Sequence, residues 1–222
     1  MPSSAIPNVS ATPVLYAPYA SSSVEVSTTE PIHQNLNPFY SERLIFRTLQ
    51  ESDFPGYHAI LKQEQAMVDA GLEPMYEEKS ARDWFNMTQE SFTRVGIFLK
   101  NSDNTEGELI GDGGVYRSPD QWPEIFYLLK KEFWGKGYAS EFVDKFKEVW
   151  WNLPRKDARM SVQSISLGKN HTSVATERLC APIRMENVKS QKVVEKAGFE
   201  FVTEFLKEEV KYVFWQNLFP GK

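Results

Sequence analysis

The sequence feature that most constrains the fold is a strand-like run that leads, through a glycine-containing turn, into an amphipathic segment. Residues 124–129 are rich in strand-forming side chains, and the turn Trp134-Gly135-Lys136-Gly137-Tyr138-Ala139 follows them closely. Apolar residues then recur at helical spacing: Phe142, Val143, Phe146, Val149 and Trp150. A strand joined to a helix by a short connection predicts an α/β domain.

The glycine turn also has a physical use. Glycine lets a backbone approach an anion closely, and the first N–H groups of a helix have no partner within the helix. The amides of residues 135–139, with the ammonium groups of Lys131 and Lys136, therefore form a candidate phosphate site. An ordinary tight turn explains the same residues. Ser140 stands where a dinucleotide fingerprint needs its third glycine, and residues 107–115 are not a P-loop because no Gly-Lys-Ser/Thr ends them.

From Glu42 onward the chain alternates strand and helix signals. We expect strands over residues 43–49, 95–100, 108–117, 201–206 and 210–215, and helices after Ser52 or Asp53, from Ser80, and over 187–196, where Gly198 ends the last one. The segment with Gly71 and Pro74, between the first two helices, reads as a loop.

The N-terminal stretch differs from the rest of the chain. Residues 1–42 contain no Lys or Arg, and six of the 13 prolines lie within residues 1–38. A signal peptide needs a basic start and a transit peptide needs arginines, so neither is indicated. Proline and serine disfavour helices and central strands. We expect a flexible tail over residues 1–37 and one folded domain over residues 38–222; packing of Val14, Leu15, Tyr16 and Tyr19 onto that domain is the alternative.

Charge and cysteine content narrow the function classes. The 25 Lys and Arg residues against 30 Asp and Glu residues leave no basic excess for nucleic acid. Cys180 is the single cysteine and the three histidines are scattered, so we expect neither an internal disulfide nor a metal site. No apolar run reaches the roughly 18 to 20 residues of a membrane span. We expect a cytoplasmic protein that binds neither nucleic acid nor membrane, and no pattern decides between monomer and homodimer.

A second motif lies further along the chain, where residues 187–199 read Asn-Val-Lys-Ser-Gln-Lys-Val-Val-Glu-Lys-Ala-Gly-Phe. Together with Glu124-Ile125-Phe126-Tyr127 and residues 134–139, it resembles the GNAT acetyltransferase superfamily, specifically the Rim-type branch, which acetylates protein N-terminal or small-molecule amines. Residues 42–47 also look like the first strand of that family. The resemblance implies a GNAT fold: a mixed, mostly antiparallel twisted sheet flanked by helices, in which a splayed strand pair binds the coenzyme.

The resemblance also implies where acetyl-CoA binds. The backbone of Leu128, Leu129 and Lys130 would bond its pantetheine arm, and the amides of Trp134, Gly135, Lys136, Gly137, Tyr138 and Ala139 its pyrophosphate. Asn187 looks like the side chain that bonds the pantetheine amides, and Ser190 lies where a hydroxyl reaches the leaving thiolate. The alternatives are that Asn187 is only a helix N-cap and that Ser190 faces solvent.

Acetyl transfer to an ammonium group needs a proton acceptor and a donor for the developing oxyanion. Glu124 is the candidate base, directly or through water; the alternative is that it faces solvent. Tyr127 fits core packing better than the donor role. Many superfamily members carry a tyrosine acid where this chain has Val194, which leaves that role to Ser190, a water or no group.

The implied function is transfer of acetyl from acetyl-CoA to a primary amine by direct attack in a ternary complex, with CoA as product. The competing interpretation is a non-catalytic acyl-CoA-binding protein of the same fold, and a different phosphate ligand on the glycine turn is a third.

One region departs from the family pattern. We expect Arg178–Ile183 to be the fifth strand, preceded by a surface insertion from Met160 in which His171 is a loop residue.

Overall fold

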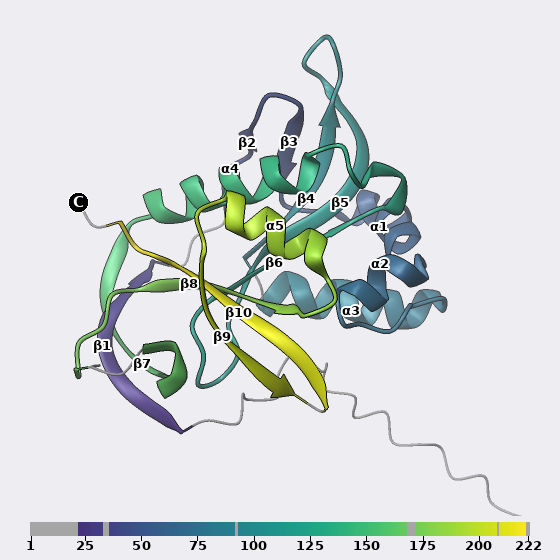
Figure 1. Ribbon diagram of the computed structural model, residues 1–222. Coiled ribbons are helices and arrows are strands. Elements are labelled where there is room, and N and C mark those ends of the chain that lie inside the picture. Colours follow the sequence, from purple (N-terminus) through teal and green to yellow (C-terminus); the bar gives the residue numbers. More distant parts are fainter. Residues whose placement is uncertain (1–21, 33–35, 92, 168–171, 208, 221–222) are drawn as a thin grey trace, which may run out of the picture.

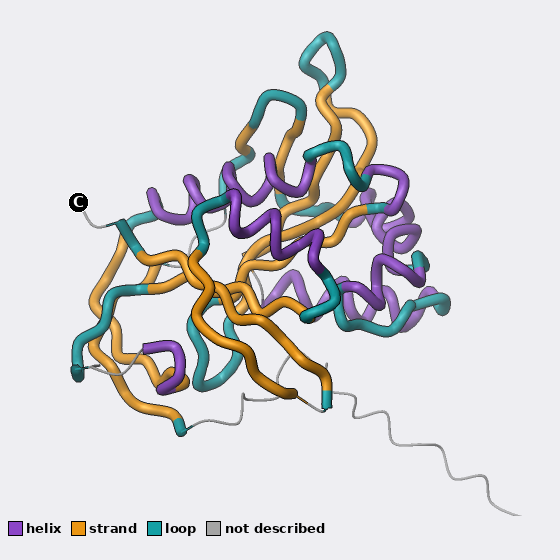
Figure 2. Tube along the Cα trace, viewed as in Figure 1, coloured by secondary structure: helices purple, strands orange, loops and turns teal. Residues whose placement is uncertain are grey.

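The computed structural model describes residues 22–32, 36–91, 93–167, 172–207 and 209–220. Its centre is an eight-stranded sheet in the order β2-β3-β4-β5-β6-β8-β10-β9 (Figures 1 and 2). Neighbouring strands are antiparallel except β6 and β8, which are parallel. The strands are β2 (Phe39–Tyr40), β3 (Leu44–Arg47), β4 (Thr93–Lys100), β5 (Glu106–Tyr116), β6 (Glu124–Leu129), β8 (Arg178–Arg184), β9 (Glu200–Lys207) and β10 (Val210–Leu218). The predicted mixed, mostly antiparallel sheet is confirmed.

Helices cover both faces of this sheet (Figure 1). On one face α4 (Tyr138–Asn152) and α5 (Val188–Lys196) bury Phe142, Phe146 and Val194 in one apolar cluster with the strands. On the other face α1 (Phe54–Leu61), α2 (Glu64–Asp69) and α3 (Glu78–Ser91) enclose a second cluster. Short 3-10 turns occur at Glu51–Asp53, Lys131–Phe133 and Ser164–Leu167.

A separate two-stranded sheet pairs β1 (Ser23–Pro31) with β7 (Arg155–Gln163), antiparallel along the full length of both strands. Val26 of β1 is buried against Trp122, Met160, Cys180 and Phe214, so β1 completes a third apolar cluster. Two expectations are corrected here. Residues 23–31 are not part of a tail, because their alternating side chains bury one face. The segment from Met160 is not wholly a surface insertion, because it begins inside β7.

Most of the remaining elements match their predicted ranges. The loop expected at Gly71 and Pro74 is confirmed, and it is preceded by a short helix, α2, whose Ala66 and Met67 are buried. The fifth strand forms where it was expected, as β8. The proposed tail over residues 1–21, and the loop histidine His171, lie outside the described residues.

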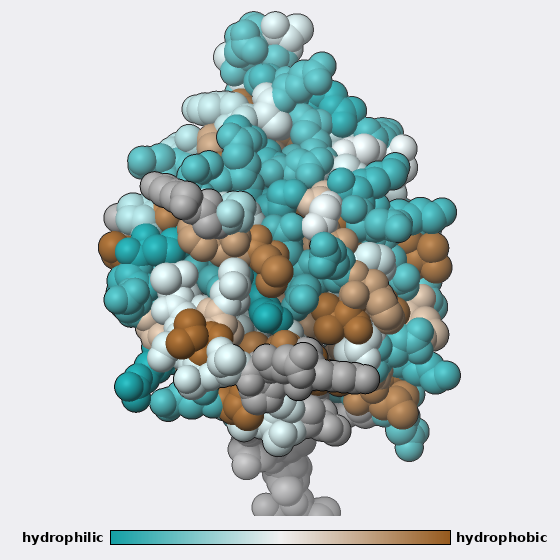
Figure 3. Space-filling model, turned by 60° about the vertical axis from the view of Figure 1, so that its left-hand side comes forward, coloured by the Kyte–Doolittle hydropathy of each residue, from teal (hydrophilic) through white to brown (hydrophobic). Residues whose placement is uncertain are grey.

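The surface carries apolar side chains in separate groups among polar ones, as the face in Figure 3 shows. The largest exposed examples include Val174, Phe201 and Leu206. Among the residues that the structure describes, no helix is both long and apolar enough to cross a membrane.

Candidate active site

The parallel pair β6 and β8 parts to form a cavity. The register between the two strands joins Glu124 to Cys180, and the backbone N–H of Cys180 donates to the Pro123 carbonyl oxygen at 2.8 Å. Further along, Leu128 and Leu129 of β6 and Ile183 and Arg184 of β8 line a cavity of about 490 Å³. A gap between two parallel strands leaves backbone N–H and C=O groups without their ladder partners, which an extended ligand can bond.

One part of the cavity, which we call the glycine-turn end, is formed by residues of the connection into α4: Trp134, Gly135, Gly137, Tyr138, Ala139 and Ser140. Gly135 and Gly137 have φ of 72° and 85°, a left-handed conformation that glycine adopts without strain. A Cβ on Gly135 would meet no atom within 4 Å, so the turn is open toward the cavity. Free amides at the start of a 15-residue helix favour an anion here.

Arg43 supports this turn, a role that the sequence did not indicate. Its Nη1 donates to the Lys136 carbonyl oxygen at 3.0 Å, and its Nη2 would lie 3.3 Å from a Cβ on Gly137. Glu141, in the first turn of α4, holds the guanidinium in an ion pair of 2.6 Å and also accepts from the Arg43 backbone N–H. Arg43 therefore fixes the turn from outside and adds positive charge beside it.

One of the expected coenzyme residues has its backbone groups bonded within the protein. The Lys130 N–H donates to the Ile110 carbonyl oxygen at 2.9 Å, its carbonyl oxygen accepts from Phe133, and its Nζ lies 2.5 Å from the Glu108 carboxylate. The Lys136 carbonyl oxygen accepts from Arg43, and its Nζ lies 5.1 Å from the centre of the Phe133 ring. The Leu129 carbonyl oxygen accepts from the Trp134 indole N–H at 2.8 Å.

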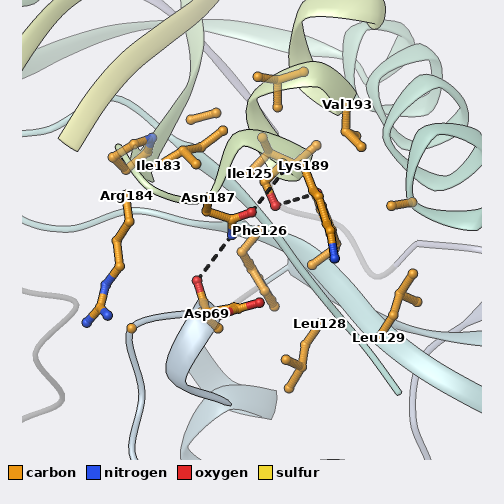
Figure 4. Close-up of a pocket in the computed structure, with 18 of the residues that line it drawn as sticks. Asp69, Ile125, Phe126, Leu128, Leu129, Ile183, Arg184, Asn187, Lys189 and Val193 are labelled. Carbon is orange, nitrogen blue, oxygen red and sulfur yellow. Dashed lines mark hydrogen bonds between the residues drawn. The ribbon is translucent and has the colours of Figure 1, made fainter. Parts of the chain in front are cut away.

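The second motif supplies the start of α5. Asn187 is the N-cap: its Oδ1 accepts from the Ser190 backbone N–H at 3.1 Å, and its Nδ2 donates to the Asp69 carbonyl oxygen at 3.3 Å (Figure 4). The cap thus ties α5 to the end of α2 across the cavity. Lys189, Lys192 and Lys196 also line the cavity from α5, so this wall is cationic.

Ser190 points to β6 rather than only to solvent. The Tyr127 hydroxyl donates to Ser190 Oγ at 2.9 Å. Burial raises the pKa of Tyr127 to about 12, so the phenol stays protonated at neutral pH. Tyr127 packs against Phe142, as the sequence favoured, and its hydroxyl donates to Ser190.

The other part of the cavity, which we call the Glu124 end, collects polar groups on the opposite face of β6. Glu124 is 2% exposed, and the Tyr116 hydroxyl donates to its carboxylate. Gln121 is also buried, and its Oε1 has no hydrogen-bond partner among the described residues. Phe126 completes this end. Glu124 therefore does not face bulk solvent, and the sequence missed Tyr116 and Gln121 because neither belongs to a motif.

No group of three or more His, Cys, Asp or Glu side chains that could hold a metal ion occurs within the described ranges. Cys180 is buried behind the cavity, where burial and the nearby Glu124 carboxylate raise the pKa of its thiol well above the ordinary value. A thiol that stays protonated is a poor nucleophile, and this one packs with Val26 and Trp122.

The structure thus combines one parted parallel strand pair with a glycine turn that lines the same cavity. The model of the acetyltransferase (GNAT) domain family matches residues 43–200, and the chain belongs to this family. It is an acyltransferase, and acetyl transfer is the general activity of its family. A curated relative, the uncharacterized N-acetyltransferase p20 of Bacillus licheniformis, is 27% identical over 140 residues, which are 58% of this chain and 76% of that protein.

Solved structures share the fold at low identity. The GNAT-family acetyltransferase of Bacillus anthracis superposes with a TM-score of 0.60 at 20% identity, covering 83% of this chain and 100% of that one. Spermidine N-acetyltransferase from Vibrio cholerae, solved with CoA and spermine, gives 0.56 at 14% identity over 80% and 96% of the chains. A putative ribosomal-protein-serine acetyltransferase from Vibrio cholerae gives 0.58 at 14% identity over 84% and 99%.

Proposed function

We propose that the chain transfers acetyl from acetyl-CoA to a primary amine by direct attack in a ternary complex. The observation that carries the proposal is one cavity with an open glycine turn in one part and a buried carboxylate, Glu124, in another. The coenzyme supplies an activated acetyl thioester. The residues present fit it, because an anion cradle without a Cβ stands beside a gap lined by strand backbone.

The coenzyme-binding residues follow from the cavity. The amides of Gly135, Gly137, Tyr138 and Ala139 would hold the pyrophosphate, and the Leu128 and Leu129 backbone and the Asn187 side chain the pantetheine arm. Lys189 and Lys192 add positive charge along the same wall. The Lys136 amide, between the two glycines, belongs to the same pyrophosphate-binding group, whereas the Lys130 backbone is bonded to Ile110 and Phe133 and is not assigned to the coenzyme.

Glu124 accepts the proton that the acceptor amine must lose, directly or through a water. Burial removes competing solvent from its carboxylate, and the Tyr116 hydroxyl fixes its orientation. On the opposite face of β6, Ser190 would donate a hydrogen bond to the leaving sulfur, and the Tyr127 hydroxyl, which donates to Ser190, supports this role.

Tyr127 itself is an orienting donor and not the acid. A thiol has an ordinary pKa of about 8.5, whereas the pKa of this phenol is about 12. Proton transfer from Tyr127 to the leaving thiolate is therefore unfavourable by roughly 3 to 4 pKa units, or about 5 kcal/mol. Val194, buried in the core at the position of the family's tyrosine, offers no alternative. Thiolate release with a serine hydrogen bond needs no strong acid.

We also place the chain in the Rim-type branch, on the Glu-Ile-x-Tyr strand, the Trp-Gly-Lys-Gly-Tyr-Ala turn and the Asn-x-x-Ser helix. The fold likeness to a putative ribosomal-protein-serine acetyltransferase is in keeping with this assignment. In this reading a protein N-terminus or a small-molecule amine is the acceptor.

The direct test is release of CoA thiol from acetyl-CoA in the presence of primary amines: alkylamines, diamines, amino acids and peptides with a free N-terminus. We expect release that requires both the protein and an amine, with the acetylated amine identified by mass. Acetyl-CoA binding without amine-dependent release across such a panel would contradict the proposal and support the non-catalytic acyl-CoA-binding alternative.

A further inference from the structure

A row of side chains from β8, β10 and β9 borders the cavity further along the sheet from Glu124. Arg184 of β8 lies opposite Tyr212 of β10, and Tyr212 lies opposite Phe205 of β9. Directly opposed residues share one face of a sheet. The Tyr212 and Phe205 rings stack at 5.3 Å with an interplanar angle of 15°, and all three residues line the cavity.

The Arg184 guanidinium and the Tyr212 hydroxyl converge on one point. That point is the bare Cα of Gly71, just after α2: a Cβ added there would lie 3.7 Å from both Nε and Nη2 of Arg184 and 3.9 Å from the Tyr212 hydroxyl oxygen. Figure 4 shows the Arg184 side chain extending away from Asn187. Gly71 therefore places only backbone against these donors, and a ligand would reach them from the cavity that Arg184 and Tyr212 both line.

Arg184 is an arginine without a carboxylate in the described part of the chain. Its Nε is buried and has no hydrogen-bond partner there. Arg47, Arg94 and Arg155, by contrast, each form an ion pair with an acidic side chain. Asp69 lines the same cavity, but its Oδ1 accepts from Gln65. A guanidinium with several N–H donors in a fixed fork matches a carboxylate or phosphate.

We propose that Arg184 and Tyr212 bind an anionic group of the acceptor, so that the enzyme prefers acceptors with an amine at one end and a carboxylate or phosphate at the other. This inference rests on the proposed function, because it assigns the acceptor of the same site. Lys207 also lines this part of the cavity and adds positive charge, which disfavours a polyamine.

The sheet geometry sets the spacing of the two charges. Glu124 is in register with Cys180, and Arg184 follows Cys180 by four positions on β8. At about 3.3 Å per residue the two backbone positions lie roughly 13 Å apart along the strand. Side chains shorten this span, so the acceptor's amine and anion are separated by several bonds, as in an ω-amino acid and unlike an α-amino acid.

The first experiment needs no variant. Thiol release is measured with β-alanine, γ-aminobutyrate and ε-aminocaproate, and with hexylamine, hexamethylenediamine and aminohexyl phosphate. We expect kcat/KM for ε-aminocaproate to exceed that for hexylamine by about 10- to 100-fold, because a hydrogen-bonded charge pair is gained, and β-alanine to be poor. An equal gain with aminohexyl phosphate assigns the subsite to anions in general. Equal rates with charged and neutral amines of one length would overturn the inference.

Variants then test whether Arg184 and Tyr212 cause the preference for an anionic acceptor. Arg184→Gln should remove most of the preference for ε-aminocaproate, mainly through KM, and leave hexylamine within about 3-fold. Arg184→Lys should retain part of it, and Tyr212→Phe should lower it by less, since the ring stack with Phe205 is kept. Lys211→Gln is the matched control, because this neighbour on β10 points to the opposite face and does not line the cavity. An Arg184→Gln enzyme that keeps the full preference contradicts the assignment.

A binding measurement separates this inference from the proposed function. Calorimetry of ε-aminocaproate into the wild-type protein saturated with CoA requires no turnover. Binding that Arg184→Gln weakens, without thiol release from acetyl-CoA, would support the anion subsite and contradict the acetyltransferase proposal. Thiol release with neutral amines, without any binding of ε-aminocaproate, would leave the proposed function standing and overturn the anion subsite.

Discussion

The two ends of the cavity are built by different means. The glycine-turn end comes from one continuous stretch, and the groups that we propose to bind the coenzyme there are the backbone amides around Gly135 and Gly137. The Glu124 end, with the Arg184 and Tyr212 pair beyond it, is made of side chains from separate strands and loops. The residues of a binding site made of backbone amides follow one another in the sequence, so the sequence can predict it. A binding site made of side chains from several strands forms only when the sheet folds. This division suits a coenzyme that stays the same across the family and an acceptor that differs between its members.

The substitution expected to separate the functions of the two ends most strongly is Glu124→Gln, which keeps the shape of the side chain and removes its charge. Because general-base catalysis contributes roughly 10²- to 10⁴-fold, we expect kcat/KM to fall by about that factor while the Kd for acetyl-CoA stays unchanged. Steady-state kinetics and calorimetry on the same preparation check both statements. Glu186→Gln, an exposed glutamate outside the cavity, is the control. Wild-type turnover in Glu124→Gln would show that the base lies elsewhere.

Tyr127 lies on β6 between the two ends, and its ionisation gives a pH signature. Its pKa is raised from 10 to about 12 by burial, so the folded state holds its proton more tightly than the unfolded chain does. Stability from this group is therefore full below pH 10 and is lost as the pH rises toward 12, a total of about 3 kcal/mol.

Denaturant unfolding of the wild type and Tyr127→Phe from pH 9 to 12 checks this expectation. The difference between the two should change by about 2 kcal/mol between pH 9 and pH 12, where the folded-state phenol is half ionised. Other titrating groups, including Tyr57, cancel in the comparison because both proteins carry them. A difference that does not depend on pH would mean that the Tyr127 hydroxyl is hydrated in the folded state.

The acceptor side of the sheet is backed by the β1–β7 pair, and Val26→Ala measures that support. Val26 is 1% exposed against Trp122 and Cys180, so the lost methyl groups and the cavity left behind should cost about 1 to 3 kcal/mol of unfolding free energy. Val174→Ala, at a residue 68% exposed, should cost less than about 0.5 kcal/mol. Equal effects would mean that β1 does not pack as described.

The sequence predicted the parts whose signals are local. The strand from Glu124, the turn to Ala139 and the helix behind it follow one another, and Asn187 caps its helix within three residues of Ser190. The buried faces of α1 and α4 could also be predicted, because large apolar residues recur at helical spacing in both.

The missed parts depend on distant partners. In β1, Ser23, Glu25 and Ser27 alternate with Val24 and Val26, and nothing local reveals that this strand pairs with β7. Arg184 lies just beyond the strand predicted to end at Ile183, and only the folded sheet brings Tyr212 and Gly71 beside it. Arg43 likewise contacts the glycine turn only through the sheet and α4. An alternating pattern in residues 23–31 was the one signal that could have indicated β1.

The central claim is that the glycine turn holds an anionic coenzyme, and Ser140 offers the most direct test. It lines the cavity in the first turn of α4, where an acidic side chain is favourable for the helix and does not disturb the fold. Ser140→Asp would place a carboxylate beside the pyrophosphate, and Ser140→Asn is its neutral match. Like charges a few ångströms apart at a partly exposed site cost roughly 3 kcal/mol, or about 100-fold.

The measurement is calorimetric titration of acetyl-CoA into the wild-type protein and these two variants. The account predicts binding by the wild type, affinity within about 3-fold for Ser140→Asn, and affinity about 100-fold weaker for Ser140→Asp. Equal affinity in all three proteins would place the coenzyme away from the glycine turn. A wild-type protein that binds no acetyl-CoA would contradict the account at its centre.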